Sequence, residues 1–374
     1  MRRLLLVTLT MLLLVFALPI RVSASGEAPR VSAASYLLMD ADSGEILAEG
    51  NANVRRPMAS TTKIMTALVV LETLPLDMVV TVDARAVGVE GSSIYLFAGE
   101  RITVRTLLYA LLLSSANDAA VALALACDDS VEAFAARMNA RAEQLSLHDT
   151  HFCNPNGLHD ETHYTTARDL ATLTKTALEN DVFAEIVSTR RYVAPQNGTD
   201  ATRLFLNHNK LLRTLDGCVG VKTGYTRAAG RCLVSASERE GLTLIAVTLG
   251  APDDWRDHTT LHEWGHAHFV AFSLSPTTLT LPVVGGTVDA VSLVPSETPR
   301  VLLPRDHETI TYRVIAPHFL FADVKKGEEC GKIRYFEGNV CIAETSLVAD
   351  NDVVAKTRTS LTLRILQFFK QRFT

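Results

Sequence analysis

Cysteine is scarce in this chain of 374 residues: there are six, spread from Cys127 to Cys341. That spacing excludes the dense disulfide framework on which many small secreted proteins depend. The sequence also lacks internal repeats and low-complexity tracts, and it has no excess of positive charge, because its formal net charge is −5. An acidic chain argues against a nucleic-acid partner. The length is sufficient for one large domain and one small domain.

The first 24 residues have the pattern of a secretory signal peptide (residues 1–24). Arg2 and Arg3 precede an apolar run from Leu4 to Ile20, and small residues up to Ala24 offer a cleavage point. An uncleaved membrane anchor is the alternative, since the run is marginally long enough to span a bilayer. In either case we expect the rest of the chain to lie outside the cytoplasm. Removal of the leader with its three arginines would bring the formal charge from −5 to about −8.

Apolar periodicity divides the next 250 residues or so into sheet and helix segments. From Ser35 to Asn51, apolar and polar residues alternate around an Asp-Ser-Gly turn, which predicts a β-hairpin. Further strand patterns lie at 220–226, 231–237 and 242–250. Helical patterns lie at 58–74, 104–113, 119–127, 131–145, the second half of 157–180, and 255–272. Sheet segments at both ends of a helical block predict an α/β domain over 25–274 with an inserted helical lobe.

The composition changes near Ser275. From there to residue 355 the chain is rich in Val, Thr, Leu and Pro, with turns such as Glu-Gly-Asn at 337–339, which predicts a small all-β domain over 275–355. The last segment, 356–374, has one broad apolar face and a basic polar face in helical projection. It predicts an amphipathic helix on a membrane surface, because it is too short and too charged to span a bilayer. A helix packed on the β domain is the alternative.

Ser60 and Lys63 lie at the start of the first helical segment, and their spacing places them on one helical face. A serine hydroxyl is a weak nucleophile until a base takes its proton. A lysine can act as that base when desolvation and neighbouring cations lower its pKa. The helix N-terminus also offers N–H groups to a developing oxyanion. Because Ser-x-x-Lys occurs by chance in chains of this size, it indicates a nucleophile only together with further motifs.

Two further motifs follow in order. Ser115 and Asn117 lie between two apolar helical segments, where helix capping alone would explain them. Lys222, Thr223 and Gly224 lie on a predicted strand. The three motifs in this order form the signature of penicillin-binding proteins and class A β-lactamases. We therefore predict that Ser115 relays a proton and that Asn117 binds a substrate amide. Lys222 and Thr223 would bind a carboxylate, and Gly224 would let the substrate backbone approach closely.

On these motifs the chain resembles the low-molecular-weight penicillin-binding proteins that are serine-type D-alanyl-D-alanine carboxypeptidases. The resemblance covers nearly the whole mature chain, and beyond the motifs it rests on the segments GSSIYLFAGERITVRTLLYALLLSSANDAA, HFCNPNGLHDETHYTTARDL, NHNKLL and GVKTGYTRAAGRCLVSASEREG. It implies a penicillin-binding/β-lactamase-like transpeptidase fold, in which an antiparallel sheet carries a helical lobe. It also implies no metal or organic cofactor, a D-alanyl-D-alanine stem peptide of peptidoglycan as substrate, β-lactams as inhibitors, and a terminal membrane-surface anchor.

The resemblance also implies roles for single residues. Ser60 would be the acylated nucleophile, Lys63 the base, and Ser115 the second-motif serine. The backbone N–H groups of Ser60 and Tyr225 would form the oxyanion hole. Arg256 falls where some members place a further carboxylate-binding arginine.

Other interpretations stay open at this point. A class A-like β-lactamase would need an added glutamate to activate water, and no segment clearly supplies one. A non-catalytic wall-binding protein of the same fold would not need the intact motifs, and transpeptidation could replace hydrolysis. The segment from His262 to His266 matches the zinc motif His-Glu-x-x-His. Its third ligand is not evident and Gly265 suits a ligand helix poorly, so packing is the better explanation.

Overall fold

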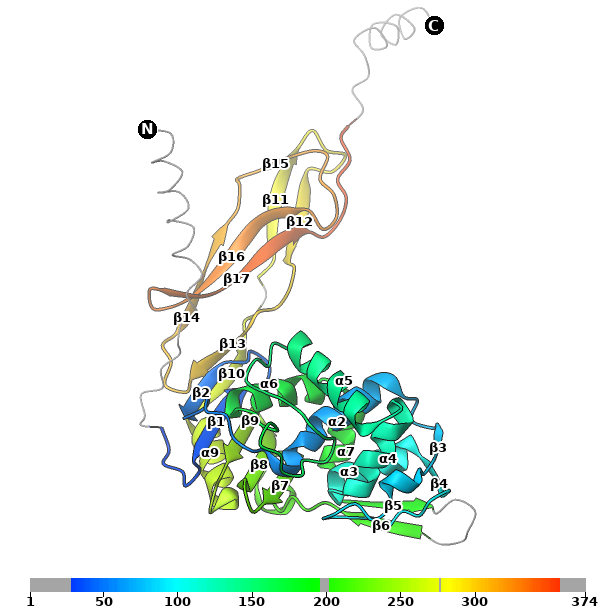
Figure 1. The fold of residues 1–374 in the computed structure, drawn as a ribbon. Coiled ribbons are helices and arrows are strands. Elements are labelled where there is room, and N and C mark those ends of the chain that lie inside the picture. The colour runs from blue at the N-terminus through cyan, green and yellow to red at the C-terminus, as the bar shows by residue number, and fades with distance from the viewer. Residues whose placement is uncertain (1–27, 196–201, 276, 357–374) are drawn as a thin grey trace, which may run out of the picture. The chain divides into compact units, whose positions relative to one another are not determined.

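The computed structural model describes residues 28–195, 202–275 and 277–356 (Figure 1). They divide into two compact units, one reaching to Val270 and the other beginning at Ala271. The predicted signal peptide and nearly all of the predicted surface helix lie outside the described residues. Within these ranges, no helix is long and apolar enough to cross a membrane. All six cysteines are described, and each is a free thiol.

The first unit is built on a five-stranded antiparallel sheet in the order β2-β1-β9-β8-β7 (Figure 1). Its strands are β1 (Ser35–Asp40), β2 (Ile46–Gly50), β7 (Cys218–Thr226), β8 (Gly230–Arg239) and β9 (Leu242–Leu249). The predicted N-terminal hairpin is confirmed as β1 and β2. Because β1 pairs with β9, a strand from the start of this unit lies beside one from its last third in the sheet. Strand β7 lies at one edge of the sheet, with only one strand beside it.

A helical lobe lies between the two halves of the sheet in the sequence and shares one apolar core with it. Its helices are α2 (Lys63–Thr73), α3 (Val104–Leu113), α4 (Asn117–Cys127), α5 (Val131–Gln144), α6 (Ala167–Leu178) and α7 (Asp181–Ser188). All of α3 except Arg105 is buried, as expected for a helix that is apolar on nearly every side. The predicted α/β domain with an inserted helical lobe is therefore confirmed.

Several smaller elements were not predicted. They are the strand pairs β3 (Val79–Thr81) with β4 (Arg101–Thr103) and β5 (Arg191–Pro195) with β6 (Thr202–Leu206), the 3₁₀ turns η2 (Ala59–Thr62) and η3 (Ala84–Ala86), and α8 (Leu211–Thr214). The helical pattern at 255–272 is only partly right. Helix α9 (Asp254–His268) ends before Phe269, and β10 (Phe269–Ser273) pairs with β13 (Arg300–Pro304). Pairing with a distant strand overrides the helical pattern of this apolar segment.

The second unit is all-β, as predicted. Its six-stranded sheet has the order β14-β16-β17-β12-β11-β15. The strands are β11 (Leu279–Val284), β12 (Ala290–Pro295), β14 (Ile310–Ile315), β15 (Leu320–Phe321), β16 (Glu329–Glu337) and β17 (Val340–Ala349). This unit has an apolar core of its own, to which Leu293, Ile333 and Leu347 contribute fully buried side chains.

Helix α9 packs on β8, where a buried chain of hydrogen bonds joins histidines and serines. Ser235 Oγ lies 2.6 Å from His258 Nδ1 and 2.7 Å from His262 Nε2. Ser237 Oγ lies 2.8 Å from both His262 Nδ1 and His266 Nε2. The three histidines are four residues apart and so lie on one face of α9. They therefore satisfy the buried serine hydroxyls of the strand, which would otherwise be costly to desolvate.

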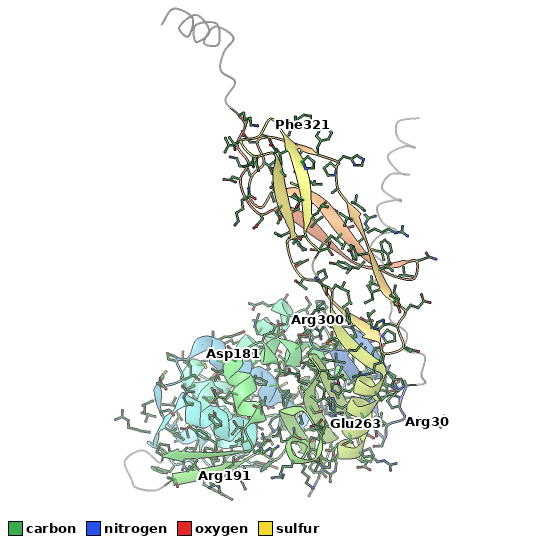
Figure 2. The ribbon with its side chains drawn as sticks, turned by 180° about the vertical axis from the view of Figure 1, so that it is seen from behind. Arg30, Asp181, Arg191, Glu263, Arg300 and Phe321 are labelled. Atoms are coloured by element: carbon green, nitrogen blue, oxygen red, sulfur yellow. The ribbon has the colours of Figure 1, made fainter. Side chains whose placement is uncertain are left out.

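This geometry does not support the zinc alternative for the His-Glu-x-x-His segment. Both ring nitrogens of His262 bond serine hydroxyls, whereas zinc ligation would need one of them. Glu263 lies at the surface (Figure 2) and pairs with Arg239 at 2.6 Å. A Cβ atom on Gly265 would lie 2.5 Å from Leu244, so this glycine lets α9 approach the sheet. Among the described residues, no group of three or more His, Cys, Asp or Glu side chains is arranged to hold a metal ion.

Acid should destabilise the contact between α9 and β8. Burial lowers the pKa of His258 from 6.5 to about 3 and holds the pKa of His262 well below 6.5. Because the folded pKa is the lower one, this stability is present above pH 6.5 and is lost as the pH falls toward 3. For His258 alone the loss at pH 4.5 is about 3 kcal/mol. Urea unfolding at pH 7.5 and 4.5 would measure it, and a His258→Gln variant that loses as much stability with acid as the parent would contradict it.

Candidate active site

The structure brings the three sequence motifs together around the amine of Lys63, the first residue of α2. Lys63 Nζ lies 2.9 Å from Ser60 Oγ, in the short turn η2 before the helix. It also donates hydrogen bonds to Asn117 Oδ1 at 2.7 Å and to the carbonyl oxygen of Asn156 at 2.6 Å. Ser60 is partly accessible, whereas Lys63 is fully buried. A hydroxyl open to a ligand thus lies next to an amine that water does not reach.

An unusual backbone conformation and two side-chain hydrogen bonds shape the turn that carries Ser60. Ala59 has a positive φ of 49°, an uncommon conformation for a residue with a side chain, and it turns the chain sharply before the helix. Thr61 Oγ1 donates to the carbonyl of Met58 at 2.6 Å, and Thr62 Oγ1 donates to the carbonyl of Ala59 at 2.8 Å. These two hydrogen bonds stabilise the turn that carries Ser60. The strain at Ala59 is of the kind that is often found at functional sites.

A loop at 153–157, which contains none of the predicted site residues, completes the surroundings of Lys63. Its Gly157 has φ +86°, and a Cβ atom there would lie 2.0 Å from the carbonyl oxygen of Ala59, so only glycine fits. His163 anchors the loop, because it accepts a hydrogen bond from the Cys153 amide at 3.0 Å and contacts Thr62 Oγ1 at 2.7 Å. The Asn-Pro-Asn-Gly sequence signals a turn but does not reveal this contact.

The electrostatic environment favours the neutral form of Lys63. Burial lowers the pKa of its amine well below 10.5, the nearby charge of Lys222 lowers it further, and Asp118 opposes both effects. Lys222 is also buried, and burial lowers its pKa to about 7. Two buried amines that repel each other electrostatically cannot both hold a proton easily. A neutral Lys63 has a lone pair with which to accept the proton of Ser60.

Ser115 and Asn117 do not cap a helix. The N-cap of α4 is Ala116, and it makes no side-chain cap hydrogen bond. Ser115 has φ +58° and lines a cavity beside Ser60. Both ends of the Asn117 side-chain amide are hydrogen-bonded within the protein. Its Oδ1 accepts from Lys63, and its Nδ2 donates to the carbonyl of Glu90 at 2.5 Å. In this arrangement Asn117 orients the Lys63 amine, in addition to any contact with a ligand.

Strand β7 contributes the third motif. Lys222 is only 1% exposed and donates a hydrogen bond to the carbonyl of Thr223 at 2.8 Å. An ideal Cβ atom on Gly224 would lie 3.0 Å from the backbone nitrogen of Ser60 and 3.2 Å from Ala59. Glycine at this position therefore lets the strand pack against the turn that holds Ser60. This packing is a structural reason for the glycine, beside the predicted close approach of a substrate backbone.

Two cavities border Ser60. The smaller, of about 310 Å³, is lined by Ser60, Ser92, Ser115, His208, Thr223, Gly224, Tyr225, Arg231, Asp254 and Trp255. The larger, of about 760 Å³, is lined by Ser60, Glu90, Gly91, Ser92, Asn117, Asn156, Gly157, Leu158, His159, Tyr225, Thr226, Arg227 and Ala228. A peptide could thus cross Ser60 with one part in each cavity.

Of the predicted site residues, the structure does not bring Arg256 to this site. Arg256 is exposed on α9 and lines neither cavity. The arginine that does line the smaller cavity is Arg231, on β8, together with His208 and Asp254. Sequence reasoning missed these three residues, since none belongs to a motif and each is brought to the cavity by a separate element.

The chain matches two family models in succession. Residues 22–253 match the model for D-alanyl-D-alanine carboxypeptidase. Residues 276–355 match the model for the C-terminal domain of penicillin-binding protein 5. Among curated relatives, D-alanyl-D-alanine carboxypeptidase DacF of Bacillus subtilis is 30% identical over 334 residues, which is 86% of each chain. D-alanyl-D-alanine carboxypeptidase DacC of Escherichia coli is 34% identical over 348 residues, covering 87% of this chain and 86% of that protein.

Solved structures agree with these relatives. Penicillin-binding protein 5 of Haemophilus influenzae superposes with a TM-score of 0.71 at 28% identity, over 88% of this chain and all of that one. The DD-transpeptidase of Streptomyces K15 superposes with a TM-score of 0.62 at 36% identity, over 65% of this chain and all of that one. The family match spans more than half of the chain and the motifs meet in one site. The chain therefore belongs to the D-alanyl-D-alanine carboxypeptidase family of serine peptidases, whose members are penicillin-binding proteins.

Proposed function

We propose that the protein removes the terminal D-alanine from peptidoglycan stem peptides through an acyl-enzyme on Ser60, and that penicillins acylate the same serine. The observation that carries the proposal is the buried amine of Lys63 at 2.9 Å from the accessible Ser60 hydroxyl. The two cavities beside Ser60 would accept the peptide. The smaller would take the terminal D-alanine, and the larger would take the stem peptide that precedes it.

Acylation would begin when Ser60 Oγ attacks the carbonyl carbon between the two D-alanines while its proton passes to the neutral Lys63 amine. The backbone N–H groups of Ser60 and Tyr225 would receive the oxyanion, and the close packing of Gly224 against the Ser60 amide supports this arrangement. The C–N bond would then break. Its nitrogen would take the proton by way of Ser115, which lines the same cavity, and free D-alanine would leave.

Deacylation would use the same groups in reverse order. Water would attack the ester carbonyl, lose a proton to the Lys63 amine, and displace Ser60 Oγ, which regains its proton. An amine of a second peptide in place of water would give transpeptidation. The name of the Streptomyces relative, a DD-transpeptidase, makes this an outcome to measure. Release of D-alanine without cross-linked product would favour hydrolysis.

Mass spectrometry of the protein after reaction with a labelled penicillin tests the proposal directly. The adduct should lie on Ser60, and a D-alanyl-D-alanine peptide should lose one D-alanine in a parallel reaction. Stable acylation by a chromogenic cephalosporin would exclude efficient β-lactamase activity, whereas rapid turnover would favour it. A folded protein that neither forms the adduct nor releases D-alanine would be the non-catalytic member of the family, and the proposal would fail.

The family consists of extracytoplasmic cell-wall enzymes. We propose that residues 1–24 direct export of this chain. We also propose that the C-terminal segment, 356–374, attaches it to the membrane surface. Support comes from sequence pattern, since both segments lie almost entirely outside the described residues. Backbone hydrogen bonds join the last described residues, Val354 and Lys356, to the rest of the second unit. The carbonyl of Val354 accepts from the Thr287 amide at 2.7 Å, and the Lys356 amide donates to the carbonyl of Gly285 at 2.7 Å.

Truncation after Lys356 should therefore release the protein from membranes without unfolding the second unit. The basic and apolar faces of 357–374 would be lost, whereas the contacts of Val354 and Lys356 would remain. Flotation with anionic vesicles measures attachment, and D-alanine release measures activity. A truncated protein that floats as well as the full chain would show that the segment is not the anchor. Loss of the thermal transition of the second unit would show that it is structural.

A further inference from the structure

One buried carboxylate is bonded to the chain segment 90–96, whose first three residues line the larger cavity beside Ser60, and the proposed mechanism does not use it. We propose that Asp118 is a positioning residue: its carboxylate holds this segment, the wall segment, in place and sets a negative charge against the two buried lysines. The inference rests on the proposed function. It adds a group that acts on the reaction through Lys63 and the cavity wall without touching the substrate.

The carboxylate accepts hydrogen bonds from three donors that are distant in the sequence. Asp118 is in the first turn of α4 and is 1% exposed. Its Oδ2 accepts from Ser93 Oγ at 2.6 Å and from the Leu96 amide at 3.1 Å, and the Ile94 amide lies 3.1 Å from Oδ2 and 3.2 Å from Oδ1. Its Oδ1 also accepts from the Ala119 amide at 2.9 Å, as suits an acid in a first turn. An ionised carboxylate can accept all of these bonds, whereas a side-chain amide has only one accepting oxygen.

The wall segment is thus bonded in both of its halves. Asn117 holds the first half, because its backbone amide donates to the carbonyl of Ser92 at 2.7 Å and its side chain donates to the carbonyl of Glu90. Asp118 holds the second half. Ser92 lines both cavities, and Glu90 lines the larger. Because neighbouring residues of one helix hold the segment, a change at Asp118 should also disturb Asn117, which bonds the Lys63 amine.

Burial of side chains does not explain the conformation of Tyr95 in the wall segment. Tyr95 is 86% exposed, and its φ of +58° is uncommon for a residue with a side chain. Such a conformation costs free energy and persists only where neighbouring contacts fix it. The Tyr95 amide donates to Ser93 Oγ at 2.9 Å, and that hydroxyl donates to Asp118. The carboxylate therefore fixes the strained residue through one intervening hydroxyl.

Asp118 also acts on the charge of the Lys63 amine. Burial and the charge of Lys222 on β7 lower the pKa of Lys63, and Asp118 on α4 raises it. Glu90 of the wall segment is exposed, and His163, which contacts the residue before Lys63, is neutral above pH 5 because burial lowers its pKa to about 4. Asp118 is therefore the anion that counteracts the lysine pair. Without it the pKa of Lys63 should fall, and acylation should persist to lower pH.

The test variant is Asp118→Asn, which keeps the size of the side chain and removes its charge. We expect kcat/KM on a D-alanyl-D-alanine peptide to fall about 10- to 100-fold, because hydrogen bonds to a charged acceptor are weakened. In acylation by a fluorescent penicillin, followed from pH 5 to 10, the acid limb of the pH–rate profile should move to lower pH. Hydrogen-exchange mass spectrometry should show faster exchange of the wall-segment amides.

Two further variants separate position from charge. Ser93→Ala removes one donor and leaves the carboxylate ionised, so the rate should fall about 3- to 10-fold while the acid limb stays in place. Asp128→Asn is the matched control, because Asp128 lies at the other end of α4 and its carboxylate bonds Arg137. This control should retain the rate, the pH profile and the hydrogen exchange of the parent.

A folded Asp118→Asn protein with the parental rate and pH profile would overturn the inference. So would a loss of rate with an unmoved acid limb and faster exchange throughout the first unit, since Asp118 would then only stabilise the fold. If Asp118→Asn does not fold, Ser93→Ala decides: a lower rate with a normal thermal transition supports the inference, and parental rate and exchange overturn it. Saturating penicillin labelling shows that Ser60 is intact in each variant. If the unmodified protein neither labels nor releases D-alanine, the proposed function itself fails.

Discussion

Replacing Ser60 with alanine should abolish D-alanine release and penicillin labelling and leave the fold unchanged. The Ser60 hydroxyl has two neighbours within hydrogen-bonding distance, Lys63 Nζ at 2.9 Å and the carbonyl of Asn156 at 3.5 Å. Lys63 keeps its bonds to Asn117 and Asn156 when the hydroxyl is removed, so no buried polar group loses all its partners. The variant lacks the oxygen that would form the ester, so the acyl-enzyme cannot form on residue 60.

Ser92→Ala is the matched control for this variant, because Ser92 lines the same two cavities as Ser60. The control should still form the penicillin adduct. Intact-mass spectrometry detects the penicillin adduct, and a coupled assay for free D-alanine measures turnover. Unchanged thermal melting of both variants establishes the fold. Labelling that persists in Ser60→Ala would place the nucleophile elsewhere and would remove the basis of the proposed mechanism.

Replacing Lys63 with methionine should lower the acylation rate by about 10²- to 10⁴-fold for every substrate, because general-base assistance has this magnitude. In the parent, acylation needs Lys63 neutral, and its rate should therefore fall as the pH drops through the pKa of that amine. Burial and Lys222 both hold this pKa below 10.5. Removing the charge of Lys222 should raise the Lys63 pKa and move the acid limb of the pH–rate profile to higher pH.

Stopped-flow acylation by a fluorescent penicillin, followed between pH 5 and 10, separates the two lysines. Lys63→Met should be slow at every pH, whereas Lys222→Met should shift the profile and regain rate as the pH rises. Thermal melting is needed for Lys63→Met, since Asn117 and Asn156 lose a buried partner. A folded Lys63→Met protein that acylates at nearly the parental rate would exclude Lys63 as the base. An unshifted profile in Lys222→Met would show that the two amines are not coupled.

Local patterns were enough to predict most of the large elements. The hairpin at the N-terminus, α3 and α5 were predicted to within a few residues because each is long, periodic and bounded by clear turn or cap signals. The order of the three motifs was likewise sufficient to choose Ser60 and Lys63 as partners, since their proximity follows from helical spacing alone. Strand β10, which pairs with the distant strand β13, was assigned to a helix, and the local hairpin of β5 and β6 was missed.

The sequence by itself determined the class of fold, the three motifs and the family they resemble. The tertiary structure decided which groups surround those motifs. The carbonyl of Asn156 reaches Lys63 across 93 residues of sequence, and Gly157 is required only because Ala59 lies against it. The register of β7 on β8 brings Arg231 to the cavity, where sequence position had suggested Arg256. Periodicity records which face of an element is buried, whereas pKa values and cavity linings depend on neighbours in space, which only the packed fold supplies.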